Sequence, residues 1–251
     1  MKKLVLLRHG ESEWNLENRF TGWTDVSLTK KGIEEAKEAG KLLKSNKYKF
    51  DIVYTSVLKR AIQTMEICLN ELNCSNVNIK YNWRLNERHY GGLQGLNKIE
   101  TAKKHGKSKV KLWRRSYEIP PPPLDISDKR HPRFDKKYKN LKSKELPNSE
   151  SLKDTFERII PLWNSEIAQQ IKNNNNLLII AHGNSLRAII KYLDNLDDNA
   201  IVDVNIPTGI PLIYELDNNL KSINHFYLCD EKILIGKIDL VANQTNKSFL
   251  K

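Results

Sequence analysis

The chain has few cysteines and no long apolar run. Its 251 residues include three cysteines, Cys68, Cys74 and Cys229, which cannot all pair with one another and show no metal-ligand spacing. This pattern argues against a disulfide-stabilised scaffold and predicts free thiols in a reducing cytoplasm. No apolar stretch approaches the roughly 20 residues needed to cross a bilayer, so we expect no membrane partner.

Acidic residues are in deficit. The chain has 42 Lys and Arg against 30 Asp and Glu, a formal net charge of +12. Such an excess favours anionic partners, which include nucleic acids and phosphorylated metabolites. The lysines are scattered and are not interleaved with aromatic residues, which argues against a nucleic-acid-binding module. We therefore expect small phosphorylated metabolites as partners and no nucleic acid.

Strand and helix patterns alternate along most of the chain. Apolar runs at residues 4–7, 52–54, 177–181 and 211–216 predict strands, with weaker candidates at 79–85 and 223–228. Helical periodicity covers residues 33–43, 58–72, 152–171 and 186–193, with an interruption near Pro161. Thr29 can cap the first of these helices, and Asn184 or Ser185 the last. The alternation predicts an α/β fold, a mainly parallel sheet flanked by helices in three layers.

The middle of the chain departs from this alternation. We expect a single domain over residues 1–251, with a largely helical insertion at about 91–149 over the active-site edge of the sheet. Its short helices are expected around residues 99–105 and 110–115. After about residue 237 periodicity is weak, and this C-terminal tail is expected to be mobile.

Two predicted strands end in the same dipeptide. Arg8-His9-Gly10 follows the first strand, and Ala181-His182-Gly183 follows the run at 177–181. If both strands are parallel in one sheet, both histidines lie at its carboxyl edge, where α/β proteins bind ligands. The alternative is a pair of structural turn histidines, which the repetition of the pattern disfavours.

Arginines accompany the histidines and favour an anionic ligand over a metal ion. Arg8 adjoins His9, Arg60 opens a helix near the same edge, and Arg114-Arg115 lie in the insertion. These cations would repel a metal ion, whereas guanidinium groups bind phosphate and carboxylate with paired hydrogen bonds. Glu87 is the best carboxylate for proton transfer, and its alternative role is an ion pair with Arg88 or a lysine. We expect no metal site.

The chain resembles a known family at these motifs and beyond them. The histidine pair is similar to that of the histidine phosphatase superfamily, and the longer matches are similar to its cofactor-dependent phosphoglycerate mutases. These matches occupy residues 8–15, 18–23, 54–61, 85–91, 95–98, 113–115 and 181–187. The tail from Lys232 onward matches less well, which leaves the family's role for it open.

The resemblance implies a glycolytic and gluconeogenic isomerase. Such an enzyme interconverts 3-phosphoglycerate and 2-phosphoglycerate through 2,3-bisphosphoglycerate, its activator and intermediate, without a metal. The resemblance also implies a cytoplasmic homodimer or homotetramer. The alternative is a phosphomonoester phosphatase, which uses the same phosphohistidine but passes the phosphoryl group to water. The balance between mutase, bisphosphoglycerate synthase and phosphatase activities stays open at this point.

The resemblance also assigns residues to roles. His9 would carry the phosphoryl group, Glu87 would exchange the proton, and Arg8, Arg60 and a protonated His182 would hold the transferred group. Residues implied in substrate binding are Ser12, Asn15, Thr21, Gly22, Arg88, Tyr90, Lys98, Arg114, Arg115, Gly183 and Asn184.

Overall fold

The computed structural model describes residues 2–74 and 76–244. A six-stranded sheet forms its centre, in the order β3-β2-β4-β1-β5-β6. The strands are β1 (Lys2–Arg8), β2 (Ile52–Thr55), β3 (Asn78–Tyr81), β4 (Leu177–Ala181), β5 (Pro211–Leu216) and β6 (Ser222–Tyr227). Strand β5 pairs antiparallel with β1 and β6, and the other pairs of neighbouring strands described here are parallel. The predicted α/β fold with a mainly parallel sheet is confirmed.

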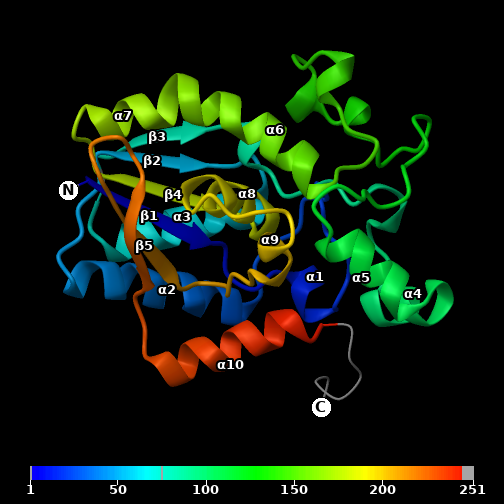
Figure 1. The fold of residues 1–251 in the computed structure, drawn as a ribbon, viewed down its shortest axis with the longest axis horizontal. Helices are drawn as coiled ribbons and strands as arrows, with labels where there is room; N and C mark the ends of the chain where they lie inside the picture. The colour runs from blue at the N-terminus through cyan, green and yellow to red at the C-terminus, as the bar shows by residue number, and fades with distance from the viewer. Residues whose placement is uncertain (1, 75, 245–251) are drawn as a thin grey trace.

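Helices follow the strands and cover the sheet (Figure 1). Those of the central fold are α2 (Lys30–Ser45), α3 (Lys59–Glu71), α6 (Leu152–Leu162), α7 (Ala168–Lys172), α8 (Gly183–Leu193) and α10 (Glu231–Ala242). Shorter or inserted helices are α1 (Glu13–Leu16), α4 (Lys98–His105), α5 (Lys107–Arg115) and α9 (Ala200–Asp203). In the described part of the chain, no helix is both long and apolar enough to cross a membrane.

Alternation of buried side chains along the strands produces two cores, one on each face of the sheet. In β1, Leu4 and Leu6 pack with α6, α7 and α8, whereas Val5 and Leu7 pack with α2 and α3. Successive strand residues point to opposite faces, so a strand buried on both sides is apolar throughout. A third cluster, which includes Phe20, Val110 and Trp113, joins the insertion to the loop after α1.

Several predicted boundaries need correction. The weak strand signal at 79–85 yields β3 only as far as Tyr81, after which residues 83–85 form a 3-10 turn. Helix α8 begins at Gly183 and not at Leu186, because His182 is its N-cap and the Ser185 hydroxyl accepts the His182 N–H at 2.9 Å. Near Pro161 the expected interruption is a π-helical segment, Trp163–Ile167, between α6 and α7.

The C-terminal region also differs from the sequence pattern. Residues 237–242, where periodicity is weak, continue helix α10, whose N-cap Asp230 accepts the backbone N–H groups of Lys232 and Ile233. Residues 245–251 of the expected tail lie outside the described residues. The helix lies alongside α2 (Figure 1), where Lys237 forms an ion pair with Glu35 at 3.1 Å. Its last turn is followed by Gln244, which reaches the insertion.

Candidate active site

The two histidines are neighbours because their strands are. Strands β1 and β4 pair in parallel with Arg8 opposite Ala181, so His9 and His182 leave the sheet at the same level. The His9 backbone N–H donates to the Ala181 carbonyl at 3.0 Å, and the ring centroids are 4.9 Å apart at an angle of 61°. Both rings are almost fully buried. The prediction that the two strand ends meet at one edge is confirmed.

His9 has a defined tautomer and protonation state. Its Nδ1 lies 2.7 Å from the Gly10 carbonyl, which only accepts hydrogen bonds, so Nδ1 carries the proton. Nε2 therefore presents a lone pair, and Arg60 Nε donates to it at 3.3 Å. Burial, together with Arg60 and Arg8, holds the pKa of His9 well below its usual range. The ring is neutral near pH 7, as a nucleophile must be.

Glycine at position 10 allows the turn after β1 to pack against α2. A Cβ at Gly10 would lie 2.2 Å from the carbonyl oxygen of Gly32 in the first turn of α2. The Gly10 N–H is satisfied by the hydroxyl of Thr64 at 3.1 Å. The close backbone contact fixes the Gly10 carbonyl, and through it the tautomer and orientation of His9.

Arg60 and Arg8 are fixed through backbone carbonyls. Arg60 donates to the Thr24 carbonyl at 3.0 Å and to the Gly22 carbonyl at 2.8 Å. Arg8 donates to the Ile206 carbonyl at 2.6 Å, and its Nε finds no partner in the described chain. Burial lowers the pKa of Arg60 to about 10, which leaves it charged near neutral pH. Two guanidinium groups therefore face the histidines at fixed positions.

His182 is held on one side only. Its Nε2 lies 2.7 Å from the hydroxyl of Ser56, and its Nδ1 lacks a partner among the described residues. Burial, followed by Arg60 and His9, holds the pKa of His182 well below its usual range. Without a bound anion the His182 ring is therefore neutral, and the protonated His182 that the resemblance implies requires a negative charge beside it.

Glu87 is the carboxylate of the site. One oxygen accepts the backbone N–H groups of Arg88 at 2.8 Å and Asn184 at 3.0 Å. The other oxygen lies on the side of Gly183, 3.7 Å from where a Cβ of that glycine would be. Glu87 makes no ion pair in the described chain, contrary to its alternative role. It joins the loop before the insertion to the start of α8.

A narrow cavity of about 70 Å³ lies beside these groups and is strongly cationic. Its lining contains six cationic side chains, Arg8, Arg19, Lys98, Arg114, Arg115 and Arg187, and one carboxylate, Glu87. Burial, followed by repulsion from Arg115, lowers the pKa of Arg114 to about 10. A buried excess of positive charge is electrostatically unfavourable until an anion compensates it, so the cavity suits a ligand with several negative charges.

The C-terminal end of the described chain reaches this cavity. The side-chain oxygen of Gln244 accepts from Lys98 at 2.9 Å and from Arg114 at 3.1 Å. Arg115 instead donates to the side chain of Asn205 and to the Val204 carbonyl. A negatively charged ligand oxygen could replace the amide oxygen of Gln244, because it accepts hydrogen bonds from the same donors and carries a full negative charge.

Most of the predicted binding residues line the cavity. Besides the cations, the lining includes Asn15, Thr21, Tyr90, Gly183 and Asn184. Gly22 is excluded from the lining, and its carbonyl holds Arg60. The buried rings of His9 and His182 and the Arg60 guanidinium also lie outside the lining.

Two predicted binding residues have positions that support neighbouring residues. Ser12 is fully buried and caps α1 in a reciprocal pair of hydrogen bonds with Asn15. Arg88 is fully buried, donates to the Arg114 carbonyl at 2.8 Å and lies over the ring of Tyr90. Neither lines the cavity. Ser12 and Arg88 instead hold the backbone and side chains of residues that line the cavity.

Arg187 is a cavity residue that the sequence analysis did not single out. It donates to the Asn184 side chain at 2.9 Å and to the Ile201 carbonyl at 2.6 Å, and it is 3% exposed. Burial lowers its pKa to about 9. The sequence did offer a signal, because Arg187 lies within the apolar helical run after His182. A charged side chain is seldom buried in such a run unless it has a polar partner.

The described residues contain no group of three or more His, Cys, Asp or Glu side chains that could hold a metal ion. The site offers guanidinium, ammonium and imidazole groups for anion binding, together with one neutral imidazole that has a free lone pair and one carboxylate. Such a set suits the transfer of a phosphoryl group through histidine.

Comparison with known proteins identifies the superfamily of the chain. A sequence profile of the histidine phosphatase superfamily (branch 1) matches residues 4–127 and 122–227. Solved structures have the same fold. They include a mycobacterial glucosyl-3-phosphoglycerate phosphatase with VO3 (TM-score 0.68, 20% identity, 90% of this chain, 97% of that one). The alpha-ribazole phosphatase from Shigella flexneri is another (TM-score 0.61, 20% identity, 86% and 91%). At this identity they support the fold alone.

A much more similar sequence narrows the class. The 2,3-bisphosphoglycerate-dependent phosphoglycerate mutase of Borreliella burgdorferi (strain ZS7) is 57% identical over 244 residues, which cover 97% of this chain and 98% of that protein. The chain belongs to the histidine phosphatase superfamily and, within it, to the 2,3-bisphosphoglycerate-dependent phosphoglycerate mutases.

Proposed function

We propose that the chain interconverts 3-phosphoglycerate and 2-phosphoglycerate, with His9 as the phosphoryl carrier and 2,3-bisphosphoglycerate as activator and intermediate. The observation that carries the proposal is a neutral His9 whose Nε2 lone pair faces Arg60, beside a cavity with six cations and one carboxylate. A bisphosphorylated carboxylic acid carries about five negative charges near neutral pH, which suits this cationic lining.

In the first half of the reaction, phosphorylated His9 gives its phosphoryl group to the 2-hydroxyl of 3-phosphoglycerate. The hydroxyl oxygen forms a bond to phosphorus, the bond from phosphorus to Nε2 breaks, and Glu87 takes the hydroxyl proton. Arg8 and Arg60 stabilise the charge that spreads over the phosphoryl oxygens in the transition state. The product in the site is 2,3-bisphosphoglycerate.

The second half reverses these bonds at the other phosphate. Once the bisphosphate has turned in the site, the Nε2 lone pair of His9 attacks the 3-phosphate and the bond to the 3-oxygen breaks. Glu87 returns its proton to that oxygen, which releases 2-phosphoglycerate and restores phosphorylated His9. A dianionic phosphate near both rings would also supply the charge that favours a proton on His182, which the chain alone does not provide.

The remaining cavity residues would bind the parts of the substrate that do not react. Lys98, Arg114 and Arg115 suit a second phosphate and a carboxylate, while Asn15, Thr21, Tyr90, Gly183 and Asn184 add neutral donors. Ser12, Gly22 and Arg88 would act through the residues that they fix. A cavity with cations for two phosphates favours retention of the bisphosphate over its loss to water.

A direct assay tests the proposed function. The purified protein is incubated with 3-phosphoglycerate, with and without a trace of 2,3-bisphosphoglycerate, and the products are resolved. We expect activator-dependent formation of 2-phosphoglycerate with little free phosphate. Free phosphate as the main product would contradict the proposal and favour a phosphatase.

A cytoplasmic location and a homo-oligomeric assembly complete the proposal. We place the enzyme in the cytoplasm as a homodimer or homotetramer, an assignment supported by its three free cysteines and its family membership. Light scattering coupled to size-exclusion chromatography gives the assembly directly, and a monomer of 29.2 kDa would contradict it.

A further inference from the structure

We propose that the outer face of the α4–α5 hairpin captures polyanionic substrate electrostatically and raises its encounter rate with the active site. This inference rests on the proposed function, because it requires a phosphoglycerate substrate. The outer face is here the exposed surface of the two helices, which carries five exposed lysines, Lys103, Lys104, Lys107, Lys109 and Lys111. The same two helices also carry Lys98, Arg114 and Arg115, which line the cavity.

The five lysines form a concentrated positive surface. None of the ion pairs found in the described part of the chain includes them, although Lys109 lies 5.3 Å from the centre of the Trp113 ring. The hairpin contributes one acidic residue, Glu100. Glu118 and Asp198 lie nearby, but they pair with Lys153 at 3.0 Å and Lys191 at 2.8 Å. Asp203 faces Arg115.

The stability of the helices does not account for these lysines. Cations in the last turn of a helix interact favourably with its dipole, which explains Lys103 and Lys104 at the end of α4. Lys107 and Lys109 lie in the first turn of α5, where cations are unfavourable and no acidic residue compensates them. A charge that weakens its own helix and has no acidic partner points to an interaction outside the helix.

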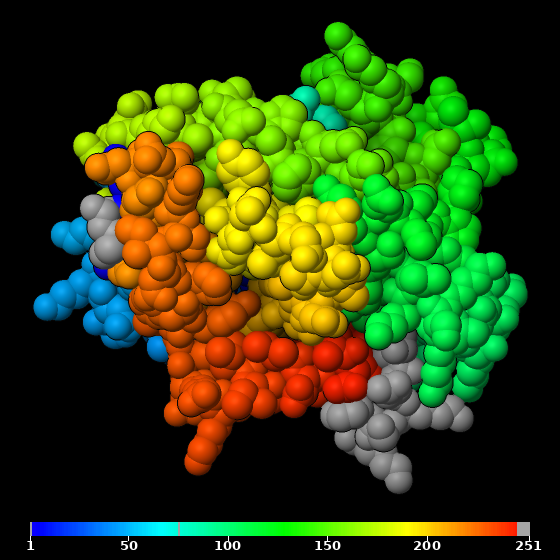
Figure 2. All heavy atoms as spheres, in the orientation of Figure 1, coloured from blue at the N-terminus to red at the C-terminus, as the bar shows by residue number. Residues whose placement is uncertain are grey.

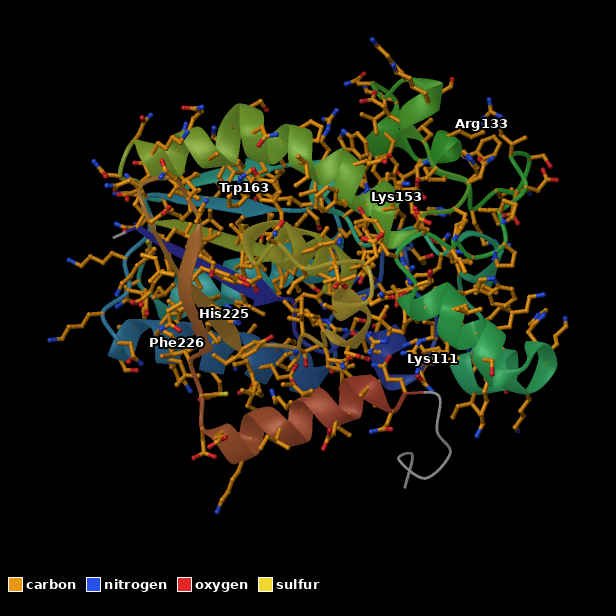
Figure 3. The ribbon with its side chains drawn as sticks, viewed as in Figure 1. Lys111, Arg133, Lys153, Trp163, His225 and Phe226 are labelled. Carbon is orange, nitrogen blue, oxygen red and sulfur yellow. The ribbon has the colours of Figure 1, made fainter. Side chains whose placement is uncertain are left out.

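The positive surface is continuous with the cavity. Lys107, Lys111 and Arg115 are four residues apart on α5 and therefore lie along one side of it, spanning about 12 Å. Arg115 lines the cavity and also a groove of about 600 Å³ between α5, the following loop and α9, which Lys111 shares. Figure 3 labels Lys111 on α5.

The location of the hairpin fits this role. Figure 2 shows α4 and α5 on the surface at the lower right, at the end of the sheet where strands β1 and β4 finish in Figure 1. A phosphoglycerate carries about three negative charges near neutral pH, and the bisphosphate about five. Positive surfaces beside a site raise the local concentration and the association rate of such ions by tenfold or more at low salt. Screening shortens the range of this effect from about 30 Å at 0.01 M to about 8 Å at 0.15 M ionic strength.

The test compares two triple variants with the same change in net charge. The hairpin variant combines Lys103→Gln, Lys107→Gln and Lys111→Gln. The control combines Lys44→Gln, Lys49→Gln and Lys172→Gln, exposed lysines at the opposite end of the sheet, of which Lys44 and Lys172 also lie in last helical turns. Mutase kcat and kcat/KM are measured from 0.01 to 0.3 M ionic strength, and thermal melting confirms folding.

We expect the hairpin variant to lose about fivefold in kcat/KM at 0.01 M, and less than about twofold at 0.3 M, with kcat unchanged. The control should match the wild type throughout. The inference is overturned by equal kcat/KM values at low salt, by a loss that persists at high salt, or by an equal loss in the control. A wild type without activator-dependent mutase activity refutes the proposed function itself, which separates the two failures.

Discussion

Replacement of Glu87 by glutamine separates proton transfer from substrate binding. One side-chain oxygen of Glu87 accepts two backbone N–H groups, at 2.8 and 3.0 Å. The amide of glutamine keeps an oxygen for these donors and has nearly the same volume. It lacks the basic oxygen and the negative charge that a proton carrier needs. The variant therefore changes the chemistry of position 87 while the start of α8 stays in place.

The expected size of the effect follows from the site. General acid–base groups contribute about 100- to 10,000-fold to rate, so kcat of Glu87→Gln should fall by that factor. This corresponds to about 3–5 kcal/mol in the activation barrier. Glu87 is the single carboxylate in a described lining with six cations, so its loss raises the positive potential of the cavity. The KM for 3-phosphoglycerate should stay constant or decrease.

Glu87→Ala provides the matched comparison for folding. Alanine leaves the N–H groups of Arg88 and Asn184 without their acceptor in a buried position. Each unsatisfied donor lowers the free energy of unfolding of the alanine variant by about 1–3 kcal/mol. The free energy of unfolding of the glutamine variant should stay within about 1 kcal/mol of the wild-type value. Urea denaturation measures both. An increase in KM with unchanged kcat in Glu87→Gln would refute the reasoning and leave Glu87 as a binding residue.

Three further predictions concern residues around the site. Arg187→Gln should raise the KM for 3-phosphoglycerate about tenfold with a smaller change in kcat, because Arg187 orients Asn184 and holds α9 through the Ile201 carbonyl; an unchanged KM in steady-state assays would contradict this. Gly10→Ala should lower the free energy of unfolding by about 1–3 kcal/mol, because the new Cβ would collide with the Gly32 carbonyl. Gly236→Ala is the control and should leave the free energy of unfolding unchanged, because no atom lies within 4 Å of its Cβ position. Equal urea midpoints for the two variants would argue against the Gly10 contact. His9, His89 and His182 all have lowered pKa values, that of His89 falling to about 3, so below pH 6.5 the unfolded chain binds protons that the folded chain does not. Stability should therefore fall by about 4 kcal/mol between pH 7.5 and 5.5, and a flat profile in urea titrations would rule out neutral histidines in the folded state.

The sequence predicts the centre of this site well. Apolar runs that end in His9 and His182 specify parallel strands, and parallel neighbours bring their carboxyl ends together. The sequence did not reveal the low pKa of His182 in the ligand-free chain, because protonation depends on which charges surround a ring in three dimensions. Burial and Arg60 disfavour the proton, and neither is encoded next to His182 in the chain.

Other features depend on long-range contacts that periodicity does not reveal. Arg187 looks like an isolated charge in an apolar helix until Asn184 and the Ile201 carbonyl are placed beside it. Helix α10 has weak periodicity because none of its residues is buried, and polar contacts such as that of Lys237 with Glu35 hold it. Ser12 and Arg88 share motifs with binding residues, but their side chains point into the supporting structure.

The central claim is that His9 carries the phosphoryl group between substrates. The most direct measurement is rapid-quench labelling with 2,3-bisphosphoglycerate that carries radioactive phosphate, followed by peptide mapping and a chase with unlabelled 3-phosphoglycerate. The account predicts one acid-labile label on His9, its absence in His9→Ala, and its transfer to bisphosphoglycerate and 2-phosphoglycerate during the chase. Label on another residue, or label that passes only to water, would contradict the account.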